Sequence, residues 1–251
     1  MADKPKRPAR LDLKSGDSKS GRLIQIGGTA VVVLFAAVLV FYIVNANHKK
    51  VAAGQEGTIR VSSSQLVTDS GKPKATVAFY EDFLCPACGN FERTFGSTVS
   101  KLIDIGAIEA DYSMVTILDR AQTQNYSSRA AAAAYCVADE SIESFRRFHS
   151  ALYSENIQPA ETGKNFPDNA RLIELAREAG AVGKVPDCIN SGKYISKVNG
   201  LAAASNIRAT PTVKINGTEF AWSTPDAFVA KIKEIVGNIP GMDEAAAAAK
   251  T

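Results

Sequence analysis

Apolar and polar positions divide the chain into three regions with different patterns. The first 22 residues are rich in Lys, Arg, Pro and Gly and lack apolar periodicity, so residues 1–22 are expected to form a disordered basic tail. The next segment, Leu23 to Val44, is almost wholly apolar, and a helix of this length, at about 1.5 Å per residue, spans a bilayer core of about 30 Å. Beyond it, short apolar runs alternate with helical periodicity. This pattern predicts one transmembrane helix, residues 23–44, followed by a globular domain.

The charges that flank the apolar run predict its orientation. Seven Lys or Arg residues precede the run, whereas only Lys49 and Lys50 follow it closely. The positive-inside rule therefore places the N-terminus in the cytoplasm and the later part of the chain outside. A cleaved signal peptide is the alternative, but its apolar region is usually about 7–15 residues long and residues 51–53 form a weak cleavage site. We expect a single-pass cell-membrane protein whose extracytoplasmic domain follows a flexible, polar tether at residues 45–58.

Short apolar runs in the exported part predict the strands of a sheet. The first lies at residues 75–80 and continues directly into the motif Cys-Pro-Ala-Cys. A helix is expected from Pro86 onward, because the missing N–H of proline costs no hydrogen bond in the first turn of a helix. Apolar residues continue this helix at helical spacing: Phe91, Phe95, Val99 and Leu102. A second strand is expected at residues 110–117.

The second half of the exported part is predicted to be helical and then to return to strands. Helical periodicity extends over about residues 121–205. A strand is expected at residues 212–215. Asn216-Gly217 then gives a strong signal for the two-residue turn of a β-hairpin, whose partner strand would lie at residues 218–222.

The C-terminal end of the chain completes the domain and then loses its pattern. A last helix is expected at residues 225–236, so that the folded domain extends over residues 59–240. Strands alternating with helices in this order place the domain in the α/β class, with helices packed against a small mixed sheet. Residues 241–251 are alanine-rich and of low complexity, and we expect them to form a disordered tail without a tertiary role.

Cys85 and Cys88 form a CxxC pair at the junction of a predicted strand and a predicted helix. Cys85 falls at the helix N-terminus, where free N–H groups and the positive end of the helix dipole stabilise a thiolate and lower the thiol pKa. Cys88 falls one turn further along, shielded by the helix and close enough to form a disulfide with Cys85. We therefore expect Cys85 to be the nucleophile and Cys88 the resolving thiol. A purely structural disulfide is disfavoured, because so short a loop constrains little of the unfolded chain.

The other two cysteines, Cys136 and Cys188, fall within the predicted helical block. An even number of cysteines in an exported protein favours pairing, so we expect a structural disulfide between them, with two buried thiols as the alternative. A zinc or copper site is disfavoured, because no second CxxC is present and His48 and His149 are the only histidines. No metal and no cofactor are therefore expected.

Thr210-Pro211 lies immediately before the strand expected at residues 212–215. Most X-Pro bonds are trans, and a proline that opens a strand is unremarkable by itself. Beside an upstream strand, CxxC and helix, however, a cis bond here would place a backbone edge next to Cys85. An extended substrate segment could pair with that edge as an added strand. Thr210 and Pro211 are therefore candidate substrate-binding residues.

The segments YEDFLCPACGNFE and ATPTVKINGTEF, with the helical block between them, resemble the DsbA-like family and in particular its membrane-anchored actinobacterial members. The resemblance covers about residues 59–236. It implies a thioredoxin fold with a helical insertion, preceded here by one transmembrane helix. It also implies that Cys85 attacks or accepts substrate sulfur, that Cys88 is its redox partner, and that the loop at Thr210-Pro211 faces them.

Two departures from the family pattern limit this transfer. Ala87 stands where enterobacterial members have histidine, so no imidazole stabilises the thiolate and a milder redox potential is expected. Phe79 stands six residues before the first cysteine, where many thioredoxins have a buried acid. Glu81 and Asp82 lie nearby and are candidates for proton transfer, although a solvated carboxylate near a loop is the simpler interpretation.

The leading functional hypothesis is an oxidase that donates the Cys85-Cys88 disulfide to reduced or unfolded exported proteins. The resemblance implies reoxidation by a quinone-linked membrane partner of the DsbB or VKOR-homologue type. A reductase or an isomerase of the same fold is the alternative. A non-catalytic scaffold or metal chaperone is disfavoured by the presence of both cysteines and Pro211. The small net charge of +3 argues against nucleic acid as a partner, and the lack of an obvious dimerisation segment favours a monomer.

Overall fold

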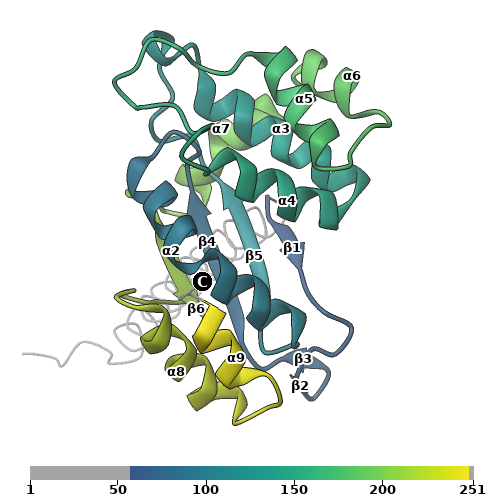
Figure 1. Ribbon diagram of the computed structural model, residues 1–251. Helices are drawn as coiled ribbons and strands as arrows, with labels where there is room; N and C mark the ends of the chain where they lie inside the picture. Colours follow the sequence, from purple (N-terminus) through teal and green to yellow (C-terminus); the bar gives the residue numbers. More distant parts are fainter. Residues whose placement is uncertain (1–56, 249–251) are drawn as a thin grey trace, which may run out of the picture. The chain divides into compact units, whose positions relative to one another are not determined.

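The computed structural model describes residues 57–248, and a five-stranded mixed sheet of order β1-β5-β4-β6-β7 forms the centre of this part of the chain (Figure 1). Its strands are β1 (Ile59–Val61), β4 (Thr76–Glu81), β5 (Glu109–Met114), β6 (Thr212–Ile215) and β7 (Thr218–Glu219). β4 is parallel to β5, whereas β1 is antiparallel to β5, and β6 is antiparallel to both β4 and β7. A separate hairpin pairs β2 (Thr68–Asp69) with β3 (Lys72–Pro73). The fold is the mixed α/β arrangement that the sequence predicts.

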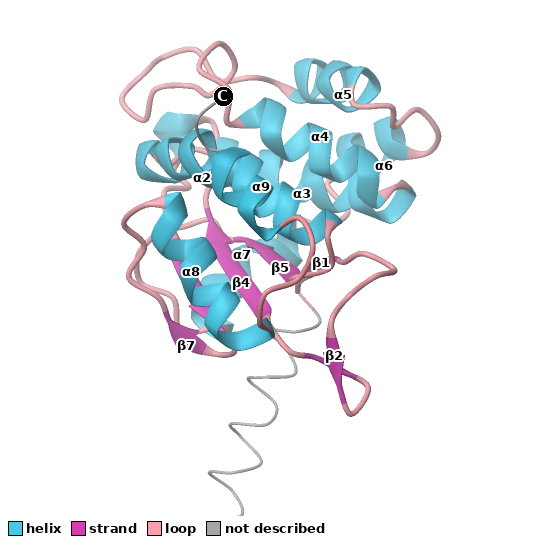
Figure 2. Cartoon of the chain, turned by 60° about the horizontal axis from the view of Figure 1, so that its bottom comes forward, coloured by secondary structure: helices cyan, strands magenta, loops and turns pink. Residues whose placement is uncertain are grey.

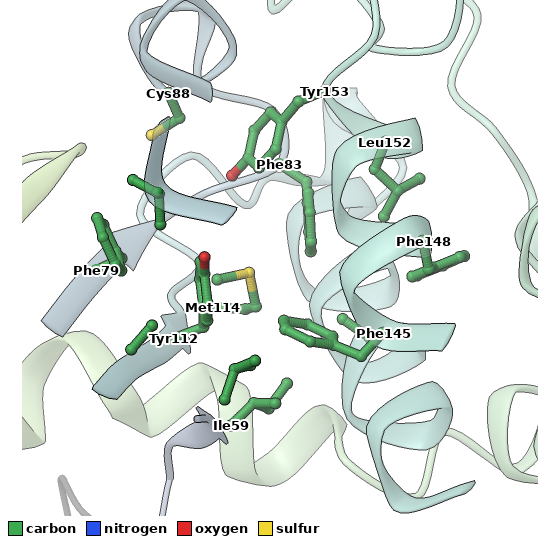
Figure 3. Close-up of a cluster of buried hydrophobic side chains, with 14 of the residues drawn as sticks. Ile59, Phe79, Phe83, Cys88, Tyr112, Met114, Phe145, Phe148, Leu152 and Tyr153 are labelled. Atoms are coloured by element: carbon green, nitrogen blue, oxygen red, sulfur yellow. The ribbon is translucent and has the colours of Figure 1, made fainter. Parts of the chain in front are cut away.

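The alternation of residues along β4 determines which side chains the sheet buries. Val77, Phe79 and Glu81 share one face of the strand, and all three are fully buried. Phe79 is opposite Tyr112 in the register with β5, and the two rings stack with centroids 5.0 Å apart. Figure 3 shows both rings within the hydrophobic core. The periodicity of the strand therefore carries Glu81 into the core, although its side chain is acidic.

Helix α2 (Pro86–Asp104) begins within the cysteine motif and packs, with the C-terminal helices, on one face of the sheet (Figure 2). Pro86 occupies the first turn, and Cys85 is the N-cap residue with an extended backbone. Phe91 and Phe95 stack with ring centroids 4.7 Å apart, and both are buried. The chain leaves the helix through Gly106, whose φ is +72° and where a Cβ would meet the Gln65 carbonyl oxygen at 2.3 Å. Glycine is therefore needed at this turn.

Five helices lie between β5 and β6 and form the helical insertion. They are α3 (Tyr126–Glu140), α4 (Ile142–Leu152), α5 (Asn169–Glu178), α6 (Val185–Ser191) and α7 (Ile195–Ala204), preceded by the short 3-10 helix η1 (Ala121–Thr123). α3 is central, and each of the other four helices packs against it. In Figure 1 they form a cluster of their own above the sheet. The small buried residues of α3, Ala130 to Ala134, allow this close approach.

The C-terminal hairpin and helix agree closely with the sequence. Asn216 and Gly217 have φ angles of +49° and +82°, the positive values that a type I′ turn requires at both positions. The Asn216 side chain also accepts a hydrogen bond of 2.8 Å from the backbone N–H of Thr76, which ties the turn to β4. α8 (Pro225–Val236) has the predicted bounds, and the Thr224 side chain accepts the capping hydrogen bond from the Ala227 N–H at 3.1 Å. The strand after the turn is shorter than expected, since β7 ends at Glu219.

The disordered tail predicted for residues 241–251 is wrong for most of its length. Residues 242–247 form helix α9 (Met242–Ala247), which packs against α2 and α8. Met242 and Ala245, three residues apart, lie on one face and are 1% and 0% exposed. Alanine is the strongest helix former, so an alanine-rich segment with one well-placed methionine has both the propensity and the apolar stripe of a packed helix. Low complexity in this segment is therefore compatible with a packed helix.

Shortening Met242 to alanine is expected to lower the free energy of unfolding by about 2–3 kcal/mol, since it removes a fully buried side chain from between helices. Chemical denaturation of the full chain measures this loss. Glu244→Ala is the matched control on the same helix, because the exposed ion pair of Glu244 with Lys101 contributes little. Equal stability of the two variants would contradict the packing of α9.

The N-terminal predictions fall almost entirely outside the described residues. The basic tail (1–22), the anchor (23–44) and all but the last two residues of the tether (45–58) precede residue 57, where the description begins. Among the helices of residues 57–248, none combines the length and the apolar character that crossing a bilayer requires. The transmembrane anchor therefore stays a prediction.

Candidate active site

Cys85 lies beside the loop that precedes β6, at one surface of the domain. Its thiol donates a hydrogen bond to the Thr210 carbonyl oxygen, with Sγ 3.4 Å from that oxygen. The Thr210-Pro211 peptide bond is cis, and both residues are partly exposed. Cys85 is itself 7% exposed, which leaves a small opening to solvent at the sulfur. The structure therefore brings together the nucleophilic cysteine and the proline loop that the sequence predicted.

Hydrogen bonds around the Cys85 sulfur favour its thiolate. The Cys88 thiol is the strongest donor, and the Thr210 side chain and the backbone N–H groups of Cys88 and Ala87 add to it. Together they outweigh the cost of burial and lower the Cys85 pKa from 9.0 to about 6. The Cys88 thiol thus makes the largest contribution to the stabilisation, and the free N–H groups at the start of α2, on which the sequence prediction relied, add a smaller part, without an imidazole at position 87.

Cys88 has the opposite environment. Its side chain is fully buried under the first turn of α2. Burial raises the Cys88 pKa far above its usual range, and the hydrogen bond to Cys85 and the charge of Glu81 act in the same direction. Near neutral pH, Cys85 is therefore a thiolate and Cys88 a thiol. The pair has the asymmetry of a nucleophile with a resolving partner.

Alkylation of the reduced protein by iodoacetamide is expected to be half-maximal near pH 6 and to label Cys85 alone, because the thiolate is the reactive form and its pKa is about 6. Below that pH the rate should fall about tenfold per unit, and above it the rate should level off. Mass spectrometry of the labelled protein at each pH gives both the rate and the site. A rate that still rises at pH 8, as for an unperturbed cysteine, would contradict the lowered pKa.

Asp82 holds the loop that leads into the cysteine motif. Its two carboxylate oxygens accept hydrogen bonds of 2.9 Å from the backbone N–H groups of Leu84 and Leu118, and its carbonyl oxygen accepts one of 2.9 Å from the Cys85 N–H. The side chain is fully buried rather than solvated, and burial raises its pKa. With both oxygens occupied by backbone donors, Asp82 is suited to position the loop.

Gln158, in the loop between α4 and α5, supports the same turn from the other side. Its amide nitrogen donates to the carbonyl oxygens of Cys85 at 3.0 Å and Phe83 at 3.3 Å, while its oxygen accepts from Arg93 at 3.1 Å. A Cβ at position 89 would lie 1.9 Å from that oxygen. Gly89 is therefore required for Gln158 to reach the cysteine loop. No local sequence pattern predicts this contact, because the partners are 73 and 75 residues apart.

Glu81 belongs to a buried cluster with His149 of α4 and Glu92 of α2. The Nε2 atom of His149 lies 2.8 Å from one Glu81 oxygen, and its Nδ1 atom lies 3.6 Å from a Glu92 oxygen. The exposed fractions of the three side chains are 0%, 5% and 7% for Glu81, His149 and Glu92. One oxygen of each carboxylate is buried without a hydrogen-bond partner among the described residues. The imidazole thus bridges two carboxyl groups, using one ring nitrogen for each.

Burial dominates the protonation of this cluster. It raises the Glu81 pKa to about 8, and the nearby Cys85 charge acts in the same direction, whereas a hydrogen bond with Glu92 opposes the shift. Burial also raises the Glu92 pKa well above its usual value and lowers that of His149. Burial therefore favours the neutral form of all three groups, and Glu81, with a pKa of about 8, holds its proton at neutral pH. Glu81 is one of the two predicted proton-transfer candidates. Its pKa of about 8 is close enough to neutral pH for it to give or take a proton during thiol-disulfide exchange.

The same three residues are the one group in residues 57–248 with the side-chain types and spacing of a metal site, their ligand atoms lying within 4.8 Å of one another. The two carboxylates, however, face different nitrogens of the His149 ring. A single ion could bind only one ring nitrogen, so one carboxylate would have to move round the ring. The arrangement suits proton sharing better than metal binding. The sequence indicates His149 only as a potential metal ligand, and Glu92 is not among the predicted site residues.

Cys136 of α3 and Cys188 of α6 are joined by a disulfide that closes 52 residues. The four sulfurs therefore form two separate pairs. The bond ties the outer helix α6 to the central helix of the insertion, and neither sulfur belongs to the CxxC site. The pairing leaves no free cysteine outside the CxxC motif in the part of the chain that the structure describes.

Comparisons with known proteins agree with this geometry. The family profile described as Thioredoxin matches residues 65–234. The reduced form of the disulfide bond oxidoreductase DsbG from Mycobacterium tuberculosis is 74% identical, with a TM-score of 0.77 over 80% of this chain and 97% of that chain. Reduced DsbA from the same organism is 75% identical, with a TM-score of 0.75 over 77% of this chain and 99% of that chain.

A curated relative shares a shorter segment. The serine/threonine-protein kinase PknE of Mycobacterium tuberculosis is 30% identical over 169 residues, which are 65% of this chain and 29% of that protein. The chain thus spans less than a third of the length of the curated relatives it matches. The family profile, in contrast, covers the CxxC motif, the helical insertion and the cis-proline loop. The chain therefore belongs to the thioredoxin family, as a DsbA-like member with a helical insertion.

Proposed function

We propose that this protein is a thiol-disulfide oxidoreductase that introduces disulfide bonds into exported proteins through Cys85 and Cys88. The observation that carries this proposal is the asymmetry of the pair, with a low-pKa thiolate that has a small opening to solvent and a fully buried thiol behind it. The cis-proline loop beside Cys85 offers a backbone edge for an extended peptide. Such an edge reads main-chain groups more than side chains, which suits a catalyst of many unfolded substrates.

The reaction consists of two thiol-disulfide exchanges. A substrate thiolate attacks Cys85 of the oxidised pair, the Cys85-Cys88 bond breaks, and Cys88 leaves as a thiolate that takes up a proton. A second substrate thiolate then attacks the substrate sulfur of the mixed disulfide, and Cys85 leaves as a stable thiolate. The substrate has lost two electrons, and the enzyme pair has gained them. The low Cys85 pKa favours this direction, because it stabilises the reduced enzyme.

The reduction potential of the pair tests the direction. We expect about −200 to −130 mV, between thioredoxin at about −270 mV and DsbA at about −120 mV, because Cys85 has a pKa between those of their nucleophiles. Equilibration with glutathione buffers and quantification of the reduced fraction measure it. Reoxidation of a reduced, unfolded disulfide protein by the purified chain tests the activity itself. A potential at or below that of thioredoxin would favour the alternative, a reductase or isomerase.

The proposal includes a location and partners. The apolar segment 23–44 would anchor the chain in the cell membrane, with the catalytic domain on the oxidising, extracytoplasmic side. Reduced exported proteins are the expected substrates, and a quinone-linked membrane protein of the DsbB or VKOR-homologue type would reoxidise the pair. A monomer suffices for these exchanges, since both cysteines and the cis-proline loop belong to one chain. Fractionation of cells and protease protection of the domain test this location.

A further inference from the structure

Every exchange cycle changes the protonation of a thiol that solvent does not reach. Cys88 must gain a proton when it leaves Cys85 and lose one when it attacks Cys85 again, yet its side chain is 0% exposed. The surface side of the pair is occupied by Cys85 and the cis-proline loop, where a bound substrate excludes water. A second route to solvent would let the proton move while the substrate is docked.

The buried cluster lies behind Cys88 and leads away from the substrate surface. Glu81 is near enough to both thiols for its charge to act on Cys88 and for the Cys85 charge to act on it. Glu92 lies one helical turn after Cys88, at the i+4 position on the same side of α2. His149 joins the two carboxyl groups, 2.8 Å from Glu81 and 3.6 Å from Glu92.

A cavity of about 290 Å³ between α2 and α4 reaches this cluster from solvent. Glu92 and His149 form part of its wall, together with Gly96, Tyr112 and Arg146. A Cβ at position 96 would approach the Glu92 carboxylate to 3.2 Å, so the glycine keeps the wall open beside that group. The cavity can hold water molecules, since it is far larger than one and is lined by several polar groups.

We propose that Glu81, His149 and Glu92 form a proton relay that connects Cys88 with the water in this cavity, by a route separate from the substrate surface. The inference deepens the proposed function, on which it rests. Each member offers a site that the relay needs. Glu81 has an unpaired buried oxygen, the neutral imidazole can donate from one nitrogen and accept at the other, and Glu92 has an unpaired oxygen and borders the cavity.

The relay acts in both half-reactions. When substrate attacks Cys85, the leaving Cys88 thiolate takes the proton of Glu81, which the cluster restores from the cavity. When the pair is reoxidised, Glu81 first passes its own proton through His149 and Glu92 to the cavity. It then takes the Cys88 proton as Cys88 attacks Cys85 in the mixed disulfide with the partner. The Cys85-Cys88 bond forms, the bond to the partner sulfur breaks, and Glu81 is left protonated. No group other than these and solvent is required to balance the step.

The titratable and charged groups that face this cluster come from every element around it. They are Cys85 and Cys88 of the site, Asp82, Tyr112 of β5, Arg146 of α4, and Tyr153 directly after α4. Burial keeps both tyrosines neutral, since it raises the pKa of each well above its usual value. Asp82 has both oxygens bound to backbone N–H groups. Glu81 is therefore the group suited to accept the Cys88 proton.

Single-turnover reoxidation of the reduced full chain by glutathione disulfide tests the relay. At high concentrations of the oxidant, formation of the Cys85-glutathione mixed disulfide is fast and attack by Cys88 limits the rate. Trp222, the only tryptophan, packs edge-on against Phe91 at 5.3 Å and against Phe95 at 5.8 Å, so its fluorescence offers a signal one turn from the site. Mass spectrometry of quenched samples measures the amount of the Cys85-glutathione mixed disulfide directly.

His149→Gln and Glu92→Gln are expected to slow the Cys88 step roughly 10- to 100-fold at pH 7, within the usual contribution of a positioned acid or base, and to change its pH profile. The rate of Cys85 alkylation should stay within about twofold, because that thiolate is stabilised by other groups. Glu174→Gln is the control: it also removes an acid, from an exposed ion pair with Arg177 on α5 that does not border the cavity. It should leave the Cys88 step unchanged.

Chemical rescue separates proton transfer from a merely structural role. In His149→Ala, added imidazole should restore the rate of the Cys88 step, whereas pyrazole, of similar shape but far weaker basicity, should not. Equal rescue by both compounds, or a pH profile identical to that of the unmodified protein in both glutamine variants, would overturn the relay. Failure of the unmodified chain to oxidise a reduced protein substrate would instead contradict the proposed function, and the glutathione experiment would still report on the relay.

Discussion

Replacing Cys88 with serine is expected to trap substrates covalently on Cys85. Cys85 in this variant keeps its place at the start of α2 and its contacts with Thr210 and the backbone N–H groups, so it still exchanges with a disulfide. Serine cannot attack the resulting mixed disulfide, because its hydroxyl is not a nucleophile at neutral pH. Oxidative activity should fall about 10³-fold or more, while mixed disulfides accumulate. Non-reducing gels and mass spectrometry of the adducts measure both effects.

Cys85→Ser is the control for this trap. It removes the nucleophile, whose sulfur has a small opening to solvent, and leaves a thiol that solvent does not reach, so activity should be lost without adducts. The roles assigned to the two cysteines would be wrong if Cys85→Ser formed adducts through Cys88. They would also be wrong if Cys88 reacted faster than Cys85 in the reduced protein near neutral pH.

The redox pair could be predicted from the sequence because its signals are local. A buried strand, a CxxC and Pro86 at a helix start all lie within residues 75–88, and the position of the Cys85 thiolate at a helix N-terminus follows from backbone geometry alone. The Asn216-Gly217 turn is local in the same sense, since positive φ angles at two adjacent positions select those residue types. Propensity and tertiary structure agree at these sites.

The cluster behind the pair could be found only in part. Glu81 continues the face that Val77 and Phe79 present to the core, so the period of the strand already contradicts a solvated carboxylate. The sequence also shows that Glu92 lies four residues after Cys88, so both could be placed on the same side of the predicted helix. The position of His149 could not be predicted, because this residue lies 68 residues after Glu81 and nothing in the neighbouring sequence indicates which strand it contacts. Long-range packing determines this contact.

This arrangement explains how Phe79 can stand where many thioredoxins have a buried acid, six residues before the first cysteine. Position 79 and position 81 share a face of β4, so the acid is displaced by two residues along the same side of the strand. There it meets a histidine from the helical insertion, whereas Phe79 packs between Phe91 and Tyr112 in the core. The helical insertion thus contributes His149 to the buried cluster that includes Glu81.

Removal of the second disulfide is expected to affect stability strongly and redox chemistry weakly. The Cys136-Cys188 bond closes 52 residues between α3 and α6. In the chain-entropy treatment, closing a loop of that length stabilises the fold by about 4 kcal/mol, an upper figure because residual structure in the unfolded chain reduces it. α6 has only seven residues, and of its side chains Val185 and Ile189 are buried, so its own packing offers limited compensation.

The double variant Cys136→Ala/Cys188→Ala should therefore unfold with a free energy about 3–4 kcal/mol lower than that of the oxidised protein, as measured by chemical denaturation. Its reduction potential and its rate of exchange with glutathione should not change at a temperature where it is folded, because neither sulfur contacts the CxxC site. The fitting control is the unmodified chain with Cys85 and Cys88 reduced but the second bond intact, which should retain most of its stability. Unchanged stability in the double variant would remove the structural role of the bond. Loss of exchange activity in a folded double variant would mean that the insertion communicates with the redox pair through this disulfide.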